Sequence, residues 1–369
     1  MGCDVELYEQ APQLREVGAG LQLSANGTRA FYELGVGEEL QALSCEAAGK
    51  EIRLWNTGET WKLFDLGKVS VERYGYPYFT VYRPDLLGVL AAAVGREKIR
   101  LGAKCLGFTQ SGHGVKLQLE NQVAEGDVLV GADGVHSTIR QALFGPDKPQ
   151  FTGIIAWRGI VPMERLPKHM ARMVGVNWVG PGGHVVHYPL RAGRVMNFVG
   201  ALERADWQVE SWSARGTPEE LAADFKGWHE DVQALIRNIP VPYKWALMVR
   251  PPMARWTVGR VTLLGDACHS MVPFLAQGAV MAIEDGYVLA RALTMSGDPA
   301  ANLLRYETAR RERTRRAVEG SADNIGRFHN RALADPAQAR EYVEREWAGQ
   351  NVASRYEWLF RYDVARAAL

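Results

Sequence analysis

Residues 261–273 read VTLLGDACHSMVP and are followed by QGA at 277–279 and IED at 283–285. The apolar, β-branched start of this stretch predicts a buried strand that ends at Gly265 and Asp266. A loop containing Pro273 follows, and a helix is expected to begin at Gln277 and Gly278. This arrangement suits a phosphorylated cofactor, because free amides at a helix N-terminus favour anions. A Gly-Asp pair alone is more often a simple turn, so the complete string is needed to indicate a cofactor site.

Size and composition exclude several classes of protein. The 369 residues can form one large domain or two interleaved domains with a substantial core. The formal net charge of +1 gives no reason to expect binding to nucleic acid or to an anionic membrane. No apolar run approaches the ~20 residues that span a bilayer, and no signal-peptide pattern opens the chain. The four cysteines are scattered along the chain and lack metal-ligand spacing: Cys3, Cys45, Cys105 and Cys268. We therefore expect no metal site and a reduced, cytoplasmic setting.

The N-terminal residues predict part of a dinucleotide-binding unit. Residues 4–10, DVELYEQ, alternate as in a strand, and Glu9 stands where such a unit binds the adenosine ribose. The strand, G-x-G-x-x-G turn and helix that normally precede this strand are not found before it. We therefore expect the first βα unit to be missing and FAD binding to be impaired. Downstream, Gly18 and Gly20 permit close approach of the backbone to a ligand, although such a pair is more often an ordinary loop.

Arg83 stands immediately before Pro84, which favours the first turn of a helix. Leu86, Leu87 and Leu90 would form the buried stripe of that helix. The guanidinium of Arg83 suits a phosphate or ribose contact, because it is planar and permanently charged. A solvated residue at the helix end is the structural alternative.

Residues 131–140 read GADGVHSTIR and predict a strand, a turn and a helix. Asp133 closes the strand, Gly134 makes the turn, Ser137 caps the helix and Arg140 lies in its first turns. A capped turn alone does not explain why Asp, Ser and Arg occur together. The segment is therefore a second candidate for cofactor binding.

After residue 151 the pattern changes to short strands, which predict a second, mainly antiparallel domain at 153–163, 173–178, 184–190 and 195–202. A hairpin is expected from 51–56 and 61–66. Strand alternation places His187 on one face, and His184 and Tyr188 on the other. Residues 217–237 predict one amphipathic helix, and residues 300–328 predict an arginine-bearing helix with a solvated charged face.

Together, Glu9 with Arg83, residues 133–140 and residues 265–285 cover nearly the whole chain in order. They resemble the motifs of the single-component FAD-dependent aromatic hydroxylases, the family that contains salicylate, hydroxybenzoate and 6-hydroxynicotinate hydroxylases. The resemblance implies an α/β fold, α+β overall: a Rossmann-like FAD-binding domain interleaved with an antiparallel substrate domain, with long C-terminal helices. The FAD-binding domain would comprise residues 1–50, 81–148 and 255–369, and the substrate domain residues 51–80 and 149–254.

The resemblance further implies non-covalent FAD, reduction by NADH or NADPH, and reaction with O2 through a flavin hydroperoxide. Asp266 would hold the ribityl chain, Pro273 would shape the loop over the flavin ring, and the helix start at Gln277 and Gly278 would face its pyrimidine side. Further cofactor contacts are implied for Glu9, Gly20, Arg83, Asp133, Gly134, Ser137, Arg140 and Gly265.

The implied substrate is a small phenolic acid of the salicylate, hydroxybenzoate or hydroxynicotinate type. Loss of the phenolic proton makes the ring more nucleophilic, so a base is needed. His187 is the candidate base, with Tyr188 in support, although a lone histidine on a strand is more often structural. Arg158 is the candidate for the substrate carboxylate.

Other functions remain open at this stage. A hydroxylase of a quinone-pathway or polyketide substrate would share both flavin motifs. A flavin-free binding or regulatory relative would explain the missing first βα unit. The aromatic C-terminal tail is expected to dock on the body of the protein or on a second copy in a homodimer. Nucleic acid is not an expected partner, since charges of both signs alternate on the arginine-bearing helix.

Overall fold

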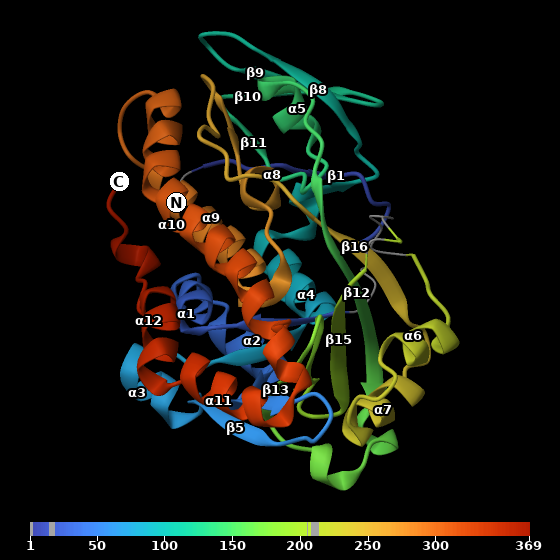
Figure 1. The fold of residues 1–369 in the computed structure, drawn as a ribbon. Helices are drawn as coiled ribbons and strands as arrows, with labels where there is room; N and C mark the ends of the chain where they lie inside the picture. Colours follow the sequence, from blue (N-terminus) through green and yellow to red (C-terminus); the bar gives the residue numbers. More distant parts are fainter. Residues whose placement is uncertain (1–2, 15–18, 205, 208–213) are drawn as a thin grey trace.

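The computed structural model describes residues 3–14, 19–204, 206–207 and 214–369. The described chain forms two joined regions (Figure 1). One region carries short parallel strands beside the long helices α9 (Gly278–Leu293) and α10 (Pro299–Phe328). The other region is built on a seven-stranded sheet. This mixed architecture with long C-terminal helices confirms the predicted fold class.

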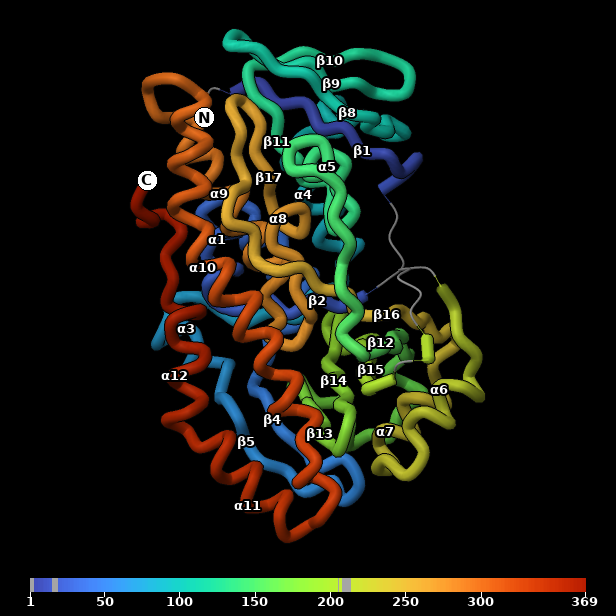
Figure 2. The backbone as a smooth tube through the Cα atoms, turned by 45° about the horizontal axis from the view of Figure 1, so that its top comes forward, coloured from blue at the N-terminus to red at the C-terminus, as the bar shows by residue number. Residues whose placement is uncertain are grey.

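In the first region, the described parallel strands form two pairs. β1 (Leu7–Glu9) pairs with β7 (Ile99–Leu101), and β11 (Leu129–Gly131) pairs with β17 (Val261–Leu263). β17 is the strand expected before Gly265, and all three of its residues are buried. Because β11 and β17 run parallel, the loops that follow them leave the same edge of the pair (Figure 2). This edge brings the two candidate cofactor segments together.

The second region is a mainly antiparallel sheet, as predicted. Its strand order is β16-β12-β15-β14-β13-β4-β5, and among these described strands only β4 and β13 pair in parallel. The predicted hairpin is present as β4 and β5. The bounds are β4 (Gly49–Leu54), β5 (Thr60–Asp65), β12 (Gln150–Pro162), β13 (Val174–Gly180), β14 (Gly183–Leu190), β15 (Val195–Glu203) and β16 (Tyr243–Val249).

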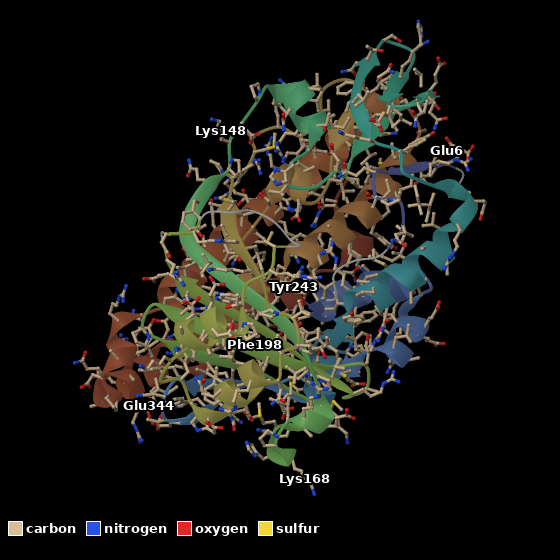
Figure 3. All side chains as sticks on the ribbon, turned by 90° about the vertical axis from the view of Figure 1, so that its right-hand side faces the viewer. Glu6, Lys148, Lys168, Phe198, Tyr243 and Glu344 are labelled. Atoms are coloured by element: carbon tan, nitrogen blue, oxygen red, sulfur yellow. The ribbon has the colours of Figure 1, made fainter. Side chains whose placement is uncertain are left out.

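The two faces of this sheet pack against different parts of the molecule. One face packs against α6 (Pro218–Asp224) and α7 (Glu230–Arg237) through large apolar side chains such as Trp157 and Phe198. Figure 3 labels Phe198 within this layer. The opposite face joins the core that contains the loop after β17 and helix α9. A ligand between the two regions would therefore meet this second face.

The prediction of one helix over 217–237 is wrong, because the segment forms two helices. Gly227 lies between α6 and α7 in the left-handed region, with φ of 84°. Each helix has its own N-cap, since the Thr217 side chain accepts from the Glu220 amide and the His229 side chain from the Asp231 amide. The buried apolar side chains of this segment therefore lie on two helices joined by a turn, rather than along one helix.

A three-stranded sheet joins the two regions. Its order is β2-β6-β3, and α4 follows β6 directly, with Pro84 in the first turn as predicted. The bounds of these and the remaining elements are β2 (Gly20–Leu23), α1 (Ala25–Glu33), α2 (Gly37–Leu43), β3 (Cys45–Glu46), α3 (Lys68–Tyr74), β6 (Phe79–Tyr82), α4 (Arg83–Val94), β8 (Cys105–Gln110), β9 (Val115–Leu119), β10 (Val123–Gly126), α5 (Thr138–Phe144), α8 (Asp266–His269), α11 (Pro336–Glu346) and α12 (Gly349–Phe360).

Helix α10 does not present only a solvated charged face, which corrects the prediction for its arginines. Arg310 is fully buried, and its guanidinium bonds Asp285 (2.7 Å) and Glu284 (2.8 Å) of α9. Arg313 also pairs with Glu284, at 2.8 Å. Arg315, by contrast, is exposed and pairs with acids of its own helix. The buried pairs tie α10 to α9.

We expect Arg310→Leu to lower the free energy of unfolding by about 3–5 kcal/mol, because it leaves the Asp285 carboxylate buried without its cation. Urea denaturation followed by tryptophan fluorescence measures this change. Arg315→Leu is the control on the same helix, and its effect should be far smaller since that ion pair is solvent-exposed. Equal losses in the two variants would contradict the assignment.

Candidate active site

A cavity of about 670 Å³ lies between the second face of the seven-stranded sheet and the loops that follow β11 and β17. Its wall is mostly apolar with a few polar side chains, as in cofactor and substrate sites. Its volume exceeds that of one small aromatic molecule. Of the predicted site residues, those that line it are Gly20, Arg83, Gly134, Tyr188, Gly265, Asp266, Pro273 and Gly278.

At the parallel-strand end, Asp266 offers a carboxylate to the cavity. It follows Gly265, whose φ of 63° lies in the left-handed region, and a Cβ there would come within 3.1 Å of the Ala282 side chain. The described residues form no hydrogen bond with the Asp266 side chain, which remains open to the cavity. The surrounding protein raises the pKa of Asp266, while nearby His269 and Arg83 oppose the rise. An acceptor of this kind suits the hydroxyls of a ligand.

The segment from Asp133 to Arg140 is held together by its own hydrogen bonds. Asp133 accepts from the amides of Thr138 (2.7 Å) and Ile139 (3.1 Å) and from the Ser137 hydroxyl (2.5 Å). Buried Arg140 donates to the carbonyl of Ala267 in α8 (2.9 Å). The segment thus fastens the loop after β11 to the loop after β17.

Burial and the neighbouring Arg250 lower the pKa of Arg140. Gly134, which lies in the turn of this segment, lines the cavity.

The helix start at Gln277 is fixed in a similar way. The Gln277 side chain donates to the Ser24 hydroxyl (2.9 Å) and accepts from the Asn26 amide (3.2 Å). Asn26 also donates to Glu284 (2.8 Å). Gln277 itself therefore lies behind the cavity wall, while Gly278 lines the cavity.

The sheet face that lines the cavity carries His184 and Tyr188 of β14. The Nδ1 atom of His184 lies 2.7 Å from Nε2 of His329, and the described residues form no hydrogen bond with its own Nε2. The ring also packs against Phe274 and Phe328. Burial lowers the pKa of His184 well below its usual value, so the ring is neutral at pH 7. A fixed, neutral imidazole at a cavity wall can accept a hydrogen bond from a ligand hydroxyl, while its lowered pKa makes it a weaker base than a free histidine.

Tyr188 lies where the backbone of β2 comes closest to the sheet. A Cβ at Gly20 would lie 2.6 Å from the Tyr188 ring and 2.8 Å from the Asn197 side chain. The Gly20 amide donates to Asn197 (2.9 Å). The close approach predicted here is therefore made to Tyr188 and Asn197, while the neighbouring Gly18 lies outside the described residues. Burial raises the pKa of Tyr188, so its phenol stays protonated and can donate a hydrogen bond.

The structure does not bring His187 into the cavity, which corrects its selection as the base. Strand alternation turns it to the opposite face, where it lines a small void of about 10 Å³ with Arg53, His169 and Asp231. Burial lowers the pKa of His187 to about 3, with a further contribution from Arg53. His184, which the alternation groups with Tyr188, takes its place as the candidate base.

Arg158 and Glu9 also lie outside the cavity lining. The Arg158 guanidinium stacks over Tyr243 (5.3 Å) and Trp245 (5.4 Å), and Figure 3 labels Tyr243 in the sheet. Trp245 lines the cavity, so Arg158 lies behind the wall, without being one of its lining residues. The Glu9 side chain accepts from the Ala11 amide (2.7 Å) at the end of β1. Lys50, which was not predicted as a site residue, lines the cavity instead.

Two further classes of site are not found. Within the described residues, no three His, Cys, Asp or Glu side chains gather as metal ligands would. No helix of the described chain combines the length and apolar character that crossing a membrane requires. The cavity is therefore the candidate site.

Comparisons with known proteins agree with this geometry. A family model described as an FAD binding domain matches residues 2–321. The 3-amino-4-hydroxybenzoate 2-monooxygenase PtnB3 of Streptomyces platensis is 37% identical, over 99% of this chain and 91% of the relative. A 6-hydroxynicotinate 3-monooxygenase of Bordetella bronchiseptica is 34% identical, over 88% of this chain and 85% of the relative.

A solved structure, that of Klebsiella pneumoniae HpxO complexed with FAD and uric acid, has a TM-score of 0.82 to this chain. The two are 26% identical, and the match covers 95% of this chain and 91% of that one. Its fold is therefore the fold seen here over almost the whole chain. Together with the family model and the curated relatives, this shows that the chain belongs to the FAD-dependent aromatic hydroxylases, a family of flavoprotein monooxygenases.

Proposed function

We propose that this chain uses FAD, NADH or NADPH, and O2 to add one oxygen atom to the ring of a small phenolic acid. One observation carries the proposal: a single cavity joins the glycine-lined loops beside Asp266 to the sheet face with His184 and Tyr188. A cofactor and a substrate can therefore meet in one continuous cavity. The names of the relatives support this class of substrate, since aminohydroxybenzoate and hydroxynicotinate are small hydroxylated aromatic acids.

The cavity wall suits a flavin dinucleotide. Bound and reduced FAD supplies the activation of O2, which protein side chains alone do not provide. Arg83 would hold a phosphate or ribose oxygen, and Asp266 would accept hydrogen bonds from the ribityl hydroxyls. Glycines at the wall allow the backbone to approach the cofactor closely: Gly20, Gly134, Gly265 and Gly278.

His184 would act as the general base, with the negative charge of the bound substrate raising the pKa of its ring above the low value in the free enzyme. A phenolate ring is more electron-rich than a phenol, so removal of the hydroxyl proton favours attack on an electrophilic oxygen. The contact with His329 fixes the His184 ring through Nδ1, which leaves Nε2 as the atom that takes the proton. Tyr188, protonated because of its raised pKa, would donate a hydrogen bond that orients the substrate.

The size of the cavity favours a one-ring substrate. Its volume of about 670 Å³ has to hold part of the cofactor together with the substrate. A flavin-free binding role receives no support from the glycine-lined wall, which has the features expected of a cofactor site.

We expect His184→Gln to lower product formation by about 100- to 10,000-fold, because the variant loses the base while the cavity keeps its shape. Product measured by chromatography, beside NADH oxidation and flavin absorbance, separates this loss from a loss of cofactor. His187→Gln on the same strand is the matched control and should change the rate only a few-fold. If His187→Gln caused the larger loss at full flavin content, the base would have to be reassigned.

We expect Asp266→Ala to weaken FAD binding by about 10- to 100-fold, the value of one hydrogen bond to a charged acceptor. Titration of the apoprotein with FAD, followed by flavin fluorescence, gives the dissociation constant. Asp127→Ala is the control, because this exposed acid lies outside the cavity lining. An unchanged dissociation constant in Asp266→Ala would remove this residue from the cofactor site.

A further inference from the structure

Lys50 is a cationic side chain on the wall of the cavity. It lies in β4 and pairs in register with Gly175 of β13. The next residue of β13, Val176, pairs with His187 of β14, so Gly175 lies in the row of Tyr188. Lys50, Gly175 and Tyr188 all line the cavity. Because the central residue of this row has no side chain, the Lys50 side chain and the Gln22 amide oxygen lie close above it, 3.5 Å and 3.9 Å from the place that a Cβ would take.

The ammonium group of Lys50 has no counter-charge in the described part of the chain. Its recorded contact is with the ring of Tyr78, 5.4 Å away. The hydroxyl of Tyr78 donates to Gln22 (3.0 Å), which also lines the cavity. The adjacent acid, Glu51, forms ion pairs with Arg53 and Arg172 instead. An enclosed cation without an anion is costly, and an anionic ligand would offset that cost.

Burial lowers the pKa of Lys50 to about 8. The side chain therefore remains mostly protonated at pH 7 and keeps its charge in the free enzyme.

We propose that Lys50 binds the carboxylate of the aromatic substrate, so that the enzyme selects an acid over a neutral phenol. The proposal rests on the proposed hydroxylase function and narrows its substrate class. The lysine replaces Arg158, which does not line the cavity and whose guanidinium is stacked over Tyr243 and Trp245. Gln22 and Tyr188 lie on the same wall and offer neutral hydrogen-bonding groups beside the cation.

The relative placement of Lys50 and His184 suits a ligand with an anion at one end and a phenol at the other. His184 lies four residues before Tyr188 on β14, and Lys50 lies two strands away in the row of Tyr188. Strand geometry puts the two α-carbons about 16 Å apart. A long lysine side chain, one aromatic ring and an imidazole can together span that separation. The carboxylate would then fix the ring while the phenol meets His184.

The test compares acids with their uncharged amides. Probes are 3-hydroxybenzoate, 6-hydroxynicotinate and 3-amino-4-hydroxybenzoate, each beside the matching carboxamide, titrated calorimetrically into the FAD-loaded enzyme. In Lys50→Met we expect the dissociation constant of the bound acid to rise about 10- to 100-fold, the value of a hydrogen bond between charged groups. The dissociation constant of the amide should change less than about two-fold.

Lys62→Met is the matched control, because this exposed lysine of β5 lies in the same hairpin. Flavin content and melting temperature report whether each variant folds. If Lys50→Met does not fold, Lys50→Gln and the acid-to-amide affinity ratio of the unmodified enzyme replace it, and a ratio near one overturns the proposal. Equal weakening of acid and amide in a folded variant overturns it as well.

The two proposals fail in different ways. An enzyme that hydroxylates the amides as well as the acids retains its proposed function but refutes the role of Lys50. An enzyme that binds FAD and hydroxylates none of the probes refutes both the proposed substrate class and the carboxylate site that depends on it.

Discussion

The buried carboxylate of Asp285 is the constraint on which the cavity depends. One oxygen accepts from the Gly265 amide (3.2 Å) and contacts His269 (2.5 Å), and the other accepts from Arg310 (2.7 Å). The loop after β17 and helix α10 are thereby joined to α9 through one side chain. Burying this charge is favourable only because every partner is present, and these partners hold the loop that carries Asp266 against α9 and α10.

The neighbouring Glu284 fixes the other half of the site in the same way. It accepts from Asn26 at the start of α1 and pairs with Arg310 and Arg313 of α10. Two adjacent acids therefore connect α1, α9, α10 and the loop after β17. Most polar side chains of the predicted cofactor motifs form hydrogen bonds or ion pairs with other residues of the protein. A ligand would therefore contact a small set of glycines and side chains that line the cavity.

Short sequence patterns are sufficient to predict much of the fold. An apolar run that ends in Gly-Asp specifies β17, and Pro84 specifies the start of α4, because both signals act within a few residues. Local pattern is not sufficient to choose between His184 and His187. Strand alternation places the two side chains on opposite faces of the sheet. Packing with α6 and α7 decides which of these faces meets the rest of the molecule. Lys50 belongs to no motif, and its proposed role depends on its place beside Gly175 of a neighbouring strand. The prediction that Arg310 lies on a solvated face is wrong, because the charge pattern of one helix does not show that acids of α9 lie opposite it.

The distribution of charge along the cavity would determine where the cofactor and the substrate bind. Arg83 is close enough to Asp266 to influence its pKa, so cation and anion lie together at the parallel-strand end. Lys50 stands on the sheet wall instead, where no acid of the described chain pairs with it. Phosphates would be attracted to Arg83, and Asp266 would disfavour an anionic ring beside them. On the proposed function, a phenolic acid would therefore be favoured near Lys50, with its hydroxyl directed along the sheet face to His184. The same electrostatic pattern would separate the cofactor from the substrate and orient the substrate for deprotonation.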